Sequence, residues 1–349
     1  MTLVASSALL IGCRDVPRIL QLDGDAFGTR YQVQVVAQGA GPCETRALAS
    51  AIEQELADID QSLSTWREDS EISAFNRRRD QAWVRLSPPF AAVMAGAMSA
   101  SRETDGAFDV TLRPLSLAWG FQGEAAPGAP SAEQAAVLRV RTGMHLLELS
   151  PDGSALRKIV PGVEIDLSAI AKGYAVDRIG TVLGSAGCED WLAEIGGEVL
   201  ARGRKPDGTA WRIAVTPPAG AGAGPGASAP LDLPVIELRN EAVATSGDYR
   251  NALLFEGRRL GHVFDPSTGR PAAGGVTSAT VTAPTTMQAD ALATAFLVMA
   301  PEASLALADR LGVGAMLILG DDKAMQVMAN DTFRDRTPGW RVAAGSREP

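Results

Sequence analysis

One stretch of the chain, residues 163–179, constrains the fold more than any other. Residues 163–167 alternate apolar and polar side chains, as a short strand does, and apolar positions then follow helical spacing over 170–179. A strand end would therefore meet a helix start, whose free backbone N–H groups favour an anionic ligand. Asp166 and Lys172 place opposite charges at this junction. The junction is either a ligand pocket or an ordinary turn with a capping Asp and a surface Lys, and the stretch alone leaves both open.

The composition is that of a globular protein with an acidic balance. The 349 residues are 46% hydrophobic and 21% charged, which allows a sizeable core in one large domain or in two ordinary ones. The formal net charge is -9 and the sequence pI is about 4.9. No basic stripe is available to neutralise phosphates, so we expect no nucleic-acid partner.

Residues 1–13 form a short apolar run that ends at Cys13. The run is too short to span a bilayer and is typical of the end of a secretion signal. Its last four residues resemble a bacterial lipobox, in which the Cys becomes the lipidated first residue of the mature protein. No Lys or Arg precedes the run, so either the start codon lies further upstream or the segment is a frayed hydrophobic end. We expect residues 1–20 to be a signal segment and tether, with lipidation at Cys13.

Two further cysteines, Cys43 and Cys188, do not have the spacing of metal ligands. They can pair in an oxidising compartment, or they can be small buried residues. The sequence leaves both alternatives open.

Apolar periodicity predicts most of the secondary structure. The expected helices cover residues 47–63, 88–104, 131–139 and 287–299. The expected strands and hairpins cover residues 21–36, 144–159, with a turn at 151–153, and 278–283. Residues 217–234 are rich in Gly, Ala and Pro, and we expect a flexible surface insertion there.

A polar loop follows the first expected helix and contains one tryptophan, Trp66. Ser70 and Glu71 can open a short helical turn within it. The simplest interpretation is a capped surface loop whose Trp66 packs into the core.

Eight short motifs, each weak alone, together resemble one family when they are taken in chain order. They are Gly28–Tyr31, Ser64–Asn76, Gly106–Asp109, Asp166–Asp177, Glu194–Glu198, Ala244–Arg250, His262–Pro271 and Ala289–Ala295. The chain resembles the ApbE-type FAD:protein FMN transferases, and the resemblance covers residues 27–311.

The resemblance implies an α+β, mixed α/β ApbE-like fold in one compact catalytic unit over residues 21–345, undivided by the 217–234 insertion. It implies an exported, Mg²⁺-dependent bacterial enzyme with FAD as its substrate. Such an enzyme transfers FMN through a phosphoester bond to a Ser or Thr hydroxyl of a target protein and releases AMP. The implied acceptors are flavoprotein subunits of membrane redox complexes. The implied location is the periplasmic side of the inner membrane, where a lipid anchor holds the protein.

Carried over position by position, the resemblance implies three groups of site residues. The FAD contacts fall on Phe27, Trp66, Ala107, Phe108, Asp109, Asp166, Lys172 and Phe264. The Mg²⁺ contacts fall on the backbone carbonyl of Ala169 and on the side chains of Asp290 and Thr294. His262 is the candidate catalytic base. Some members have an acidic residue in place of Lys172 and an Asp in place of Ala293, so flavin and metal contacts can differ in detail.

The chemistry of these side chains is compatible with the roles that the resemblance implies but does not establish them by itself. Asp290 and Thr294 are four residues apart on an expected helix, so their oxygens share one face and suit Mg²⁺. Without the other motifs, both would be interpreted as solvated surface residues. A histidine such as His262 is a common general base. The other histidine, His145, lies in an apolar run and is expected to be a core or hairpin residue.

Several alternative functions stay open. The same fold would serve an FAD pyrophosphatase that uses water as the acceptor, or a non-catalytic flavin-binding lipoprotein. A purely structural envelope protein is a third alternative. A serine hydrolase is not indicated, because the sequence has no Gly-x-Ser-x-Gly motif, and no Gly-x4-Gly-Lys-Ser/Thr phosphate loop occurs either.

Overall fold

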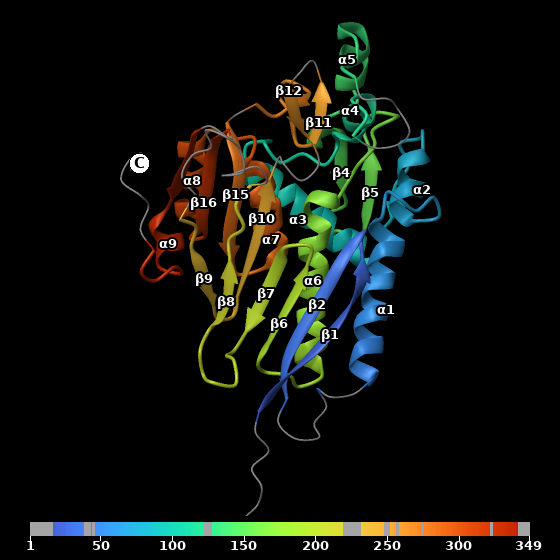
Figure 1. Ribbon diagram of the computed structural model, residues 1–349. Helices are drawn as coiled ribbons and strands as arrows, with labels where there is room; N and C mark the ends of the chain where they lie inside the picture. The colour runs from blue at the N-terminus through green and yellow to red at the C-terminus, as the bar shows by residue number, and fades with distance from the viewer. Residues whose placement is uncertain are drawn as a thin grey trace, which may run out of the picture.

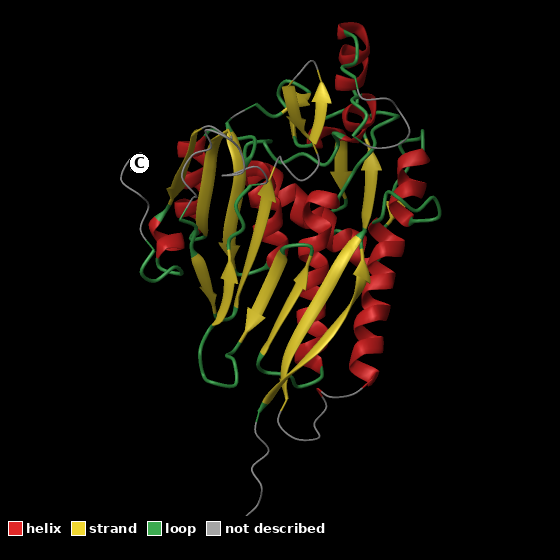
Figure 2. Cartoon of the chain, viewed as in Figure 1, coloured by secondary structure: helices red, strands yellow, loops and turns green. Residues whose placement is uncertain are grey.

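A large antiparallel sheet forms the centre of the structure, a computed structural model shown in Figures 1 and 2. Its strands lie in the order β1-β2-β6-β7-β10-β15-β16-β17, and every neighbouring pair is antiparallel. They span Arg18–Ala26 (β1), Thr29–Ala37 (β2), Trp191–Ile195 (β6), Glu198–Arg202 (β7), Glu241–Gly247 (β10), Val276–Ala283 (β15), Gly314–Asp321 (β16) and Ala324–Ala329 (β17).

The structure describes residues 17–37, 43, 46–121, 128–218, 232–247, 252–255, 258–273, 275–321 and 324–340. The expected lipidation site Cys13 lies outside these residues. So does most of the expected flexible insertion, residues 219–231.

Most of the helices cover one face of the large sheet and its upper end in Figure 2, whereas the last one contributes Phe333 to the core on the other face. They span Arg46–Leu63 (α1), Glu71–Arg77 (α2), Pro88–Glu103 (α3), Arg113–Ala118 (α4), Ala132–Arg139 (α5), Ser168–Ser185 (α6), Thr286–Phe296 (α7), Pro301–Leu311 (α8) and Asp331–Arg334 (α9), with a 3₁₀ turn at Met144–Leu146 (η2). Within the described ranges, no helix is both long enough and apolar enough to cross a bilayer.

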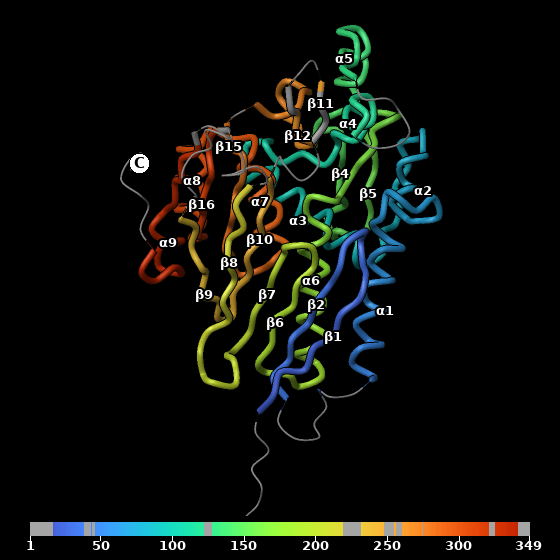
Figure 3. Tube along the Cα trace, viewed as in Figure 1, coloured from blue at the N-terminus to red at the C-terminus, as the bar shows by residue number. Residues whose placement is uncertain are grey.

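Four small sheets complete the part of the fold that the structure describes, and the tube in Figure 3 shows how the chain joins them to the large sheet. Their strands are Val84–Arg85 (β3), Leu147–Leu149 (β4) and Ala155–Lys158 (β5); Trp211–Ala214 (β8) and Val235–Leu238 (β9); Ala252–Phe255 (β11) and Arg258–Gly261 (β12); and Phe264–Asp265 (β13) and Arg270–Pro271 (β14). The β11–β12 hairpin and α4 lie above one end of the large sheet (Figure 1).

The large sheet separates two apolar cores, because alternate residues of each strand face opposite sides. In β16, Ala315 and Leu317 join the core on the helical side. Met316 and Ile318 join the other core, which the β8–β9 hairpin covers with the buried Trp211. Helices α6 and α7 both pack on the helical side of the sheet. The expected α+β fold in one compact unit is confirmed.

Most predicted elements are confirmed. At least one end of each lies within one or two residues of the predicted end. The N-terminal hairpin is β1–β2, and the four predicted helices are α1, α3, α5 and α7. Ser70 caps α2 as expected, since its hydroxyl accepts from the backbone N–H of Ser73. The predicted hairpin over 144–159 is formed by β4 and β5.

The strand predicted over residues 163–167 is wrong. Burial does alternate along this segment, but the segment belongs to no sheet. Its polar backbone groups find other partners. The Asn76 amide donates to the Ile165 carbonyl and accepts from the Ile165 N–H, both at 2.8 Å, and the Asp166 N–H donates to the Val110 carbonyl. The Asn76 side-chain amide therefore makes the hydrogen bonds that a neighbouring strand would otherwise make.

Two carboxylates, one from each helix, join α6 to α7 by hydrogen bonds to the backbone of the other helix. Asp177 of α6 accepts from the backbone N–H groups of Thr286 and Met287 at the start of α7, at 2.8 and 3.0 Å. In return, Asp290 of α7 accepts from the backbone N–H of Gly173 in α6, at 3.0 Å. The helices approach so closely at Gly173 that a Cβ atom there would overlap the backbone of α7.

Cys43 and Cys188 form a disulfide, with their Cα atoms 5.8 Å apart. The bond ties the segment before α1 to the segment after α6, and 145 residues separate its two ends. The alternative of two unpaired, buried cysteines is therefore wrong. A bond that closes so long a loop restricts the unfolded chain and typically adds about 2–4 kcal/mol to the free energy of unfolding.

The α6–α7 contact yields a prediction with an internal control. Gly173→Ala should lower the free energy of unfolding by about 1–3 kcal/mol, because the added methyl group overpacks the helix contact. Gly184→Ala, in the same helix, should raise it by up to about 1 kcal/mol, because its nearest neighbour is the Arg202 guanidinium at 3.7 Å. Urea denaturation measures both values. Equal effects of the two substitutions would contradict the close contact.

Candidate active site

A cavity of about 500 Å³ lies where several segments meet at one end of the large sheet. The contributing segments are the β1–β2 and β6–β7 turns, the end of β10, the start of α6, helix α7, the loop after α3, helix α4 and residues 262–264. The cavity brings together every site residue expected from the sequence within the described chain: Phe27, Trp66, Ala107, Phe108, Asp109, Asp166, Ala169, Lys172, His262, Phe264, Asp290 and Thr294.

Phe27 reaches the cavity from a strained hairpin turn. Phe27 and Gly28 connect β1 to β2, with φ values of +51° and +71°, as a type I′ turn requires. The left-handed conformation is easy for Gly but costs other L-residues about 1–2 kcal/mol. The other described non-glycine residues with positive φ are Asp105 and Asn240, both of types that tolerate it. An aromatic residue held in this conformation beside a cavity suggests a functional reason for the strain.

Asp166 lies two residues before the start of α6 and lines the cavity. Its carboxylate accepts from the backbone N–H of Ser168, the first residue of α6, at 2.9 Å. The N-cap residue of α6 is Leu167, with no side-chain capping hydrogen bond, so the interpretation of Asp166 as a helix cap is wrong and its interpretation as a pocket residue holds.

Lys172 is not the ordinary surface lysine that the alternative interpretation required. Its Nζ lies 2.6 Å from a carboxylate oxygen of Glu198, whose side chain is only 2% exposed, and both residues line the cavity. A buried carboxylate needs such a partner, because its desolvation is costly. The sequence placed Glu198 in a motif but gave it no role. Its signal was an acid directly after the glycine pair 196–197, which forms the β6–β7 turn with φ values of +61° and +109°.

Asp109 lies at the inner wall of the cavity. Burial raises the pKa of its carboxyl, although hydrogen bonds from the Thr111 hydroxyl and N–H, at 2.6 and 2.7 Å, oppose the shift. The preceding Phe108 is almost fully buried in the main core. Its cavity contact is therefore limited to the small part of the residue that the core leaves uncovered.

Phe264 anchors the segment that carries His262. Its ring packs edge-on against Phe121 and Trp119, with centroids 5.6 and 6.4 Å away. These rings and Leu115 form a separate small core beneath α4. This packing fixes β13 and thereby the position of His262, two residues earlier and half-buried in the cavity wall.

Two other candidates for the base are less suitable. Burial works to raise the pKa of Asp265, but hydrogen bonds from Ser267 and Thr268 outweigh it and hold that pKa below the usual range. Asp265 is also absent from the cavity lining. His145 belongs to the predicted 144–159 region, as expected, but it is exposed in η2, so its placement in the core is wrong.

The three expected Mg²⁺ ligands lie at the α6–α7 contact. Asp290 is 2% exposed, which rules out the solvated-surface interpretation. Thr294 lies one turn further along α7, and its hydroxyl is 3.2 Å from the Ser246 hydroxyl at the end of β10. The Gly173 N–H that donates to Asp290 is the group that a regular helix directs to the Ala169 carbonyl. All three residues line the same cavity, and a carboxylate, a hydroxyl and a carbonyl oxygen together fit a hard cation.

This donor set contains only one carboxylate. Among the residues that the structure describes, no group of three or more His, Cys, Asp or Glu side chains could hold a metal. An all-protein cage for a transition metal is thus missing from the described ranges. Mg²⁺ commonly binds through one or two carboxylates plus water and substrate phosphates, so a sparse set of oxygen ligands suits it.

The interpretation of Trp66 as a core residue is wrong. Its side chain is 80% exposed at the rim of the cavity. Several further lining residues had no sequence signal. Arg113, Ser116 and Phe121 come from the short helix α4 and its flank, where no periodic pattern or motif marks them. Asp248, Tyr249 and Arg250, the last three residues of the Ala244–Arg250 motif, lie outside the described residues.

The chain belongs to the ApbE family, whose model matches residues 27–317. A Vibrio cholerae protein named FAD:protein FMN transferase is 35% identical over 332 residues, which cover 95% of this chain and 96% of that protein. A Haemophilus influenzae protein with the same name is 33% identical, with 96% of each chain covered.

Solved structures agree with this assignment. The chain superimposes on the apo form of the flavinyl transferase ApbE from Pseudomonas stutzeri with a TM-score of 0.83 and 33% sequence identity. The match covers 93% of this chain and 98% of that one. The likeness therefore extends over the whole fold, including the segments that form the cavity.

The strained turn yields a prediction about stability and binding. Phe27→Asn and Phe27→Ala should both weaken FAD binding, by about tenfold, because each removes an aromatic ring from the cavity. The Asn variant should be more stable than the Ala variant by about 1 kcal/mol, since Asn tolerates positive φ. Calorimetric titration with FAD and thermal melting measure the two effects. Unchanged FAD affinity would contradict a role for Phe27 in the site.

Proposed function

We propose that the chain transfers FMN from FAD to a Ser or Thr hydroxyl of a target flavoprotein, with Mg²⁺ as cofactor, and releases AMP. The general activity follows from membership of the family. The chain is an enzyme that moves FMN from FAD to a protein, like its relatives at 30–35% identity. The proposed Mg²⁺ cofactor and hydroxyl acceptor are supported most directly by one observation. A buried carboxylate, a hydroxyl and a histidine line the same cavity.

The transfer requires one bond to form and one to break. The acceptor hydroxyl oxygen bonds to the phosphorus of the FMN half of FAD, and the anhydride bond from that phosphorus to the AMP phosphate breaks. His262 takes the hydroxyl proton, and AMP departs with the electron pair of the broken bond. In this arrangement the acceptor hydroxyl must come within hydrogen-bond reach of His262.

Three groups would hold the metal ion: the Asp290 carboxylate, the Thr294 hydroxyl and the Ala169 carbonyl. When bound, Mg²⁺ supplies charge neutralisation at the pyrophosphate. Lys172, held by its ion pair with the buried Glu198, lines the same cavity, where its ammonium group could donate to a phosphate oxygen. Phe27 and Trp66 provide aromatic surface at the rim, which suits a flavin or adenine ring.

We further propose that the protein is anchored by a lipid on Cys13 at the periplasmic side of the inner membrane. The lipobox-like run supports this location, as does the Cys43–Cys188 disulfide, because such bonds persist in oxidising compartments. The proposed acceptors are flavoprotein subunits of membrane redox complexes, which a tethered enzyme could reach.

Substitutions in the cavity should separate the base from the metal ligand. His262→Ala should slow FMN transfer by about 10²–10⁴-fold while FAD still binds, the usual effect of losing a general base. Asp290→Asn, which keeps an acceptor for the Gly173 N–H, should instead raise the Mg²⁺ concentration needed for half-maximal rate. His145→Ala is the matched control and should transfer normally.

Mass spectrometry of the acceptor and quantification of AMP follow these reactions. One AMP per FMN adduct supports the transferase, and AMP without an adduct would favour the pyrophosphatase alternative. Near-normal transfer by His262→Ala at neutral pH would refute its assignment as the base.

The anchor can be tested by fractionation. A full-length chain with an added upstream signal should partition with membranes, whereas its Cys13→Ala variant should be soluble, because stable anchoring depends on the acyl chains. Identical fractionation of the two proteins would refute lipidation at Cys13.

A further inference from the structure

A buried lysine, Lys158, lies at the end of strand β5 and is absent from the cavity lining. Only 2% of the residue is exposed. Its ammonium group donates to the backbone carbonyls of Asn76 and Arg78, at 3.2 and 2.9 Å. It also lies 4.8 Å from the centre of the Phe75 ring. Since these three residues form the end of helix α2 and its C-cap, Lys158 holds the last turn of that helix.

Packing alone does not explain why this buried residue is a lysine. Burial lowers the pKa of Lys158 to about 8, and the positive charge of Arg79 adds to the effect. The carboxylates of Glu164 and Asp80 oppose it. A buried cation that contacts no carboxylate is costly, and an apolar side chain of similar volume would avoid this cost. Departures of this kind from the rules of packing are concentrated at functional sites.

We propose that Lys158 is a positioning residue of the FAD site, which acts through Asn76 on the backbone that carries Asp166. This inference rests on the proposed function, because Asp166 is assigned to FAD by the family resemblance. It adds two residues that do not touch the substrate but determine the place of one that does.

The first step of this connection is the Asn76 side chain. Asn76 is 6% exposed, and Lys158 holds the carbonyl of the same residue. The amide donates to the Ile165 carbonyl and accepts from the Ile165 N–H, each at 2.8 Å. Two hydrogen bonds to one residue fix both the position and the orientation of its backbone. They matter here because residues 163–167 belong to no sheet.

The second step is the backbone around Asp166. This residue follows Ile165 directly, and its N–H donates to the Val110 carbonyl at 2.8 Å. Val110 in turn follows Asp109, another expected FAD contact, and both acidic residues line the cavity. A shift of Ile165 would therefore reach two acidic residues of the cavity wall. Binding sites depend on such support, since they must be held within about 0.5 Å of the productive geometry.

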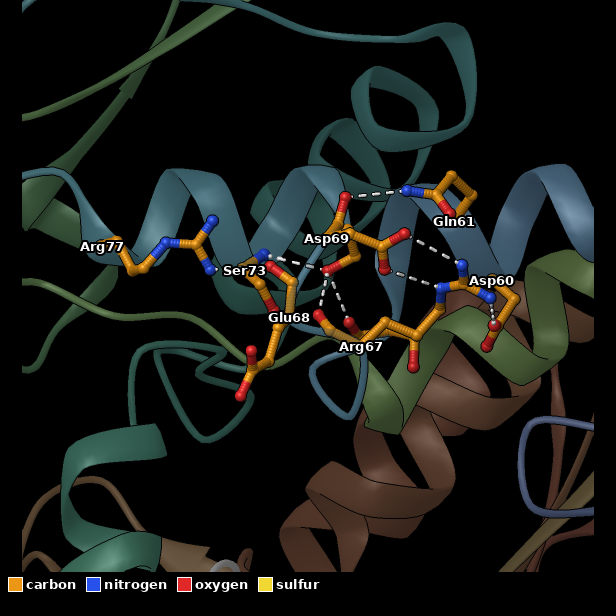
Figure 4. A network of polar contacts seen from close by, with 9 residues as sticks. Asp60, Gln61, Arg67, Glu68, Asp69, Ser73 and Arg77 are labelled. Atoms are coloured by element: carbon orange, nitrogen blue, oxygen red, sulfur yellow. Dashed lines mark hydrogen bonds and ion pairs between the residues drawn. The ribbon is translucent and has the colours of Figure 1, made fainter.

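Surface side chains also hold α2, but they do so from the solvent. Figure 4 shows the network before the helix, where the Arg67 guanidinium contacts the carboxylates of Asp69 and Asp60. Arg79 donates to the Asn76 carbonyl at 2.7 Å, but its side chain is 60% exposed. Exposed ionic side chains fix a geometry weakly, because they lose entropy and are screened. The buried lysine differs from them in that the core surrounds it.

A double-mutant cycle tests the connection. Lys158→Met keeps the volume and removes the charge. It should raise the Kd for FAD about fivefold in the wild-type background, and by less than about twofold in the Asp166→Ala background. Calorimetric titration with FAD gives the four Kd values. Lys205→Met, in the loop between β7 and β8 and outside the cavity lining, is the matched control and should leave the Kd unchanged.

Thermal melting separates positioning from support of the fold. The melting temperature of Lys158→Met should change by less than about 3 °C, because removing a buried charge offsets the lost hydrogen bonds. Should this variant not fold, Lys158→Gln, which keeps a donor without the charge, provides the same cycle.

Hydrogen exchange provides a readout that needs no ligand. The Ile165 N–H should exchange at least about tenfold faster in Lys158→Met than in the wild type, because its acceptor is less firmly held. The amides of β10, in the large sheet, should exchange at the wild-type rate.

Two results would overturn the proposal. One is an unchanged Kd for FAD in the Lys158 variant, and the other is an equal rise in both backgrounds, because Lys158 would then act elsewhere. Absence of FAD binding by the wild type would refute the proposed function instead. The exchange rate of the Ile165 N–H would still decide whether Lys158 controls this segment.

Discussion

The reciprocal bonds between α6 and α7 are the interaction on which the site depends. Asp177 holds the first turn of α7, and Asp290 holds the Gly173 N–H in the first half of α6. Ala169 and Lys172 of α6 and Thr294 of α7 line the same cavity. A residue larger than Gly at 173 would push the helices apart and separate the oxygens expected to share the metal ion.

The cavity is also supported from outside this helix pair. Glu198 fixes Lys172 from the β6–β7 turn, and the Asn76 amide fixes the backbone beside Asp166. The aromatic cluster around Phe264 fixes the segment with His262. Each supporting group comes from a different part of the chain, so the site forms only when the whole sheet has folded.

Local patterns predicted the regular parts of the fold. Helices such as α1 and α3 have clear apolar periodicity, and β1–β2 alternates along its length. The strand predicted over 163–167 failed because alternation reports which side chains are buried, not which backbone groups are paired. Here a distant amide, Asn76, provides the partners, and no local pattern encodes it. The exposure of Trp66 was missed for a related reason, since the polar network of its loop holds the ring outside the core.

The residues of the site were predictable only as an ordered set of motifs. Asp290 and Thr294 alone are typical of a helix surface, and only the fold buries Asp290. The partner of Lys172 could not be predicted from spacing, because Glu198 reaches it across a turn of the sheet. Arg113 and Phe121 come from a short helix and its flank, whose sequence has no distinguishing pattern.

We propose that one cavity holds FAD together with a cation at the α6–α7 contact. A crystal structure of the complex with FAD and Mn²⁺, which scatters anomalously and replaces Mg²⁺, tests it most directly. We expect an anomalous peak within coordination distance of the Asp290 carboxylate, the Thr294 hydroxyl and the Ala169 carbonyl, with the FAD pyrophosphate beside it. An anomalous peak bound to other residues, or FAD bound outside the cavity, would refute the proposed site.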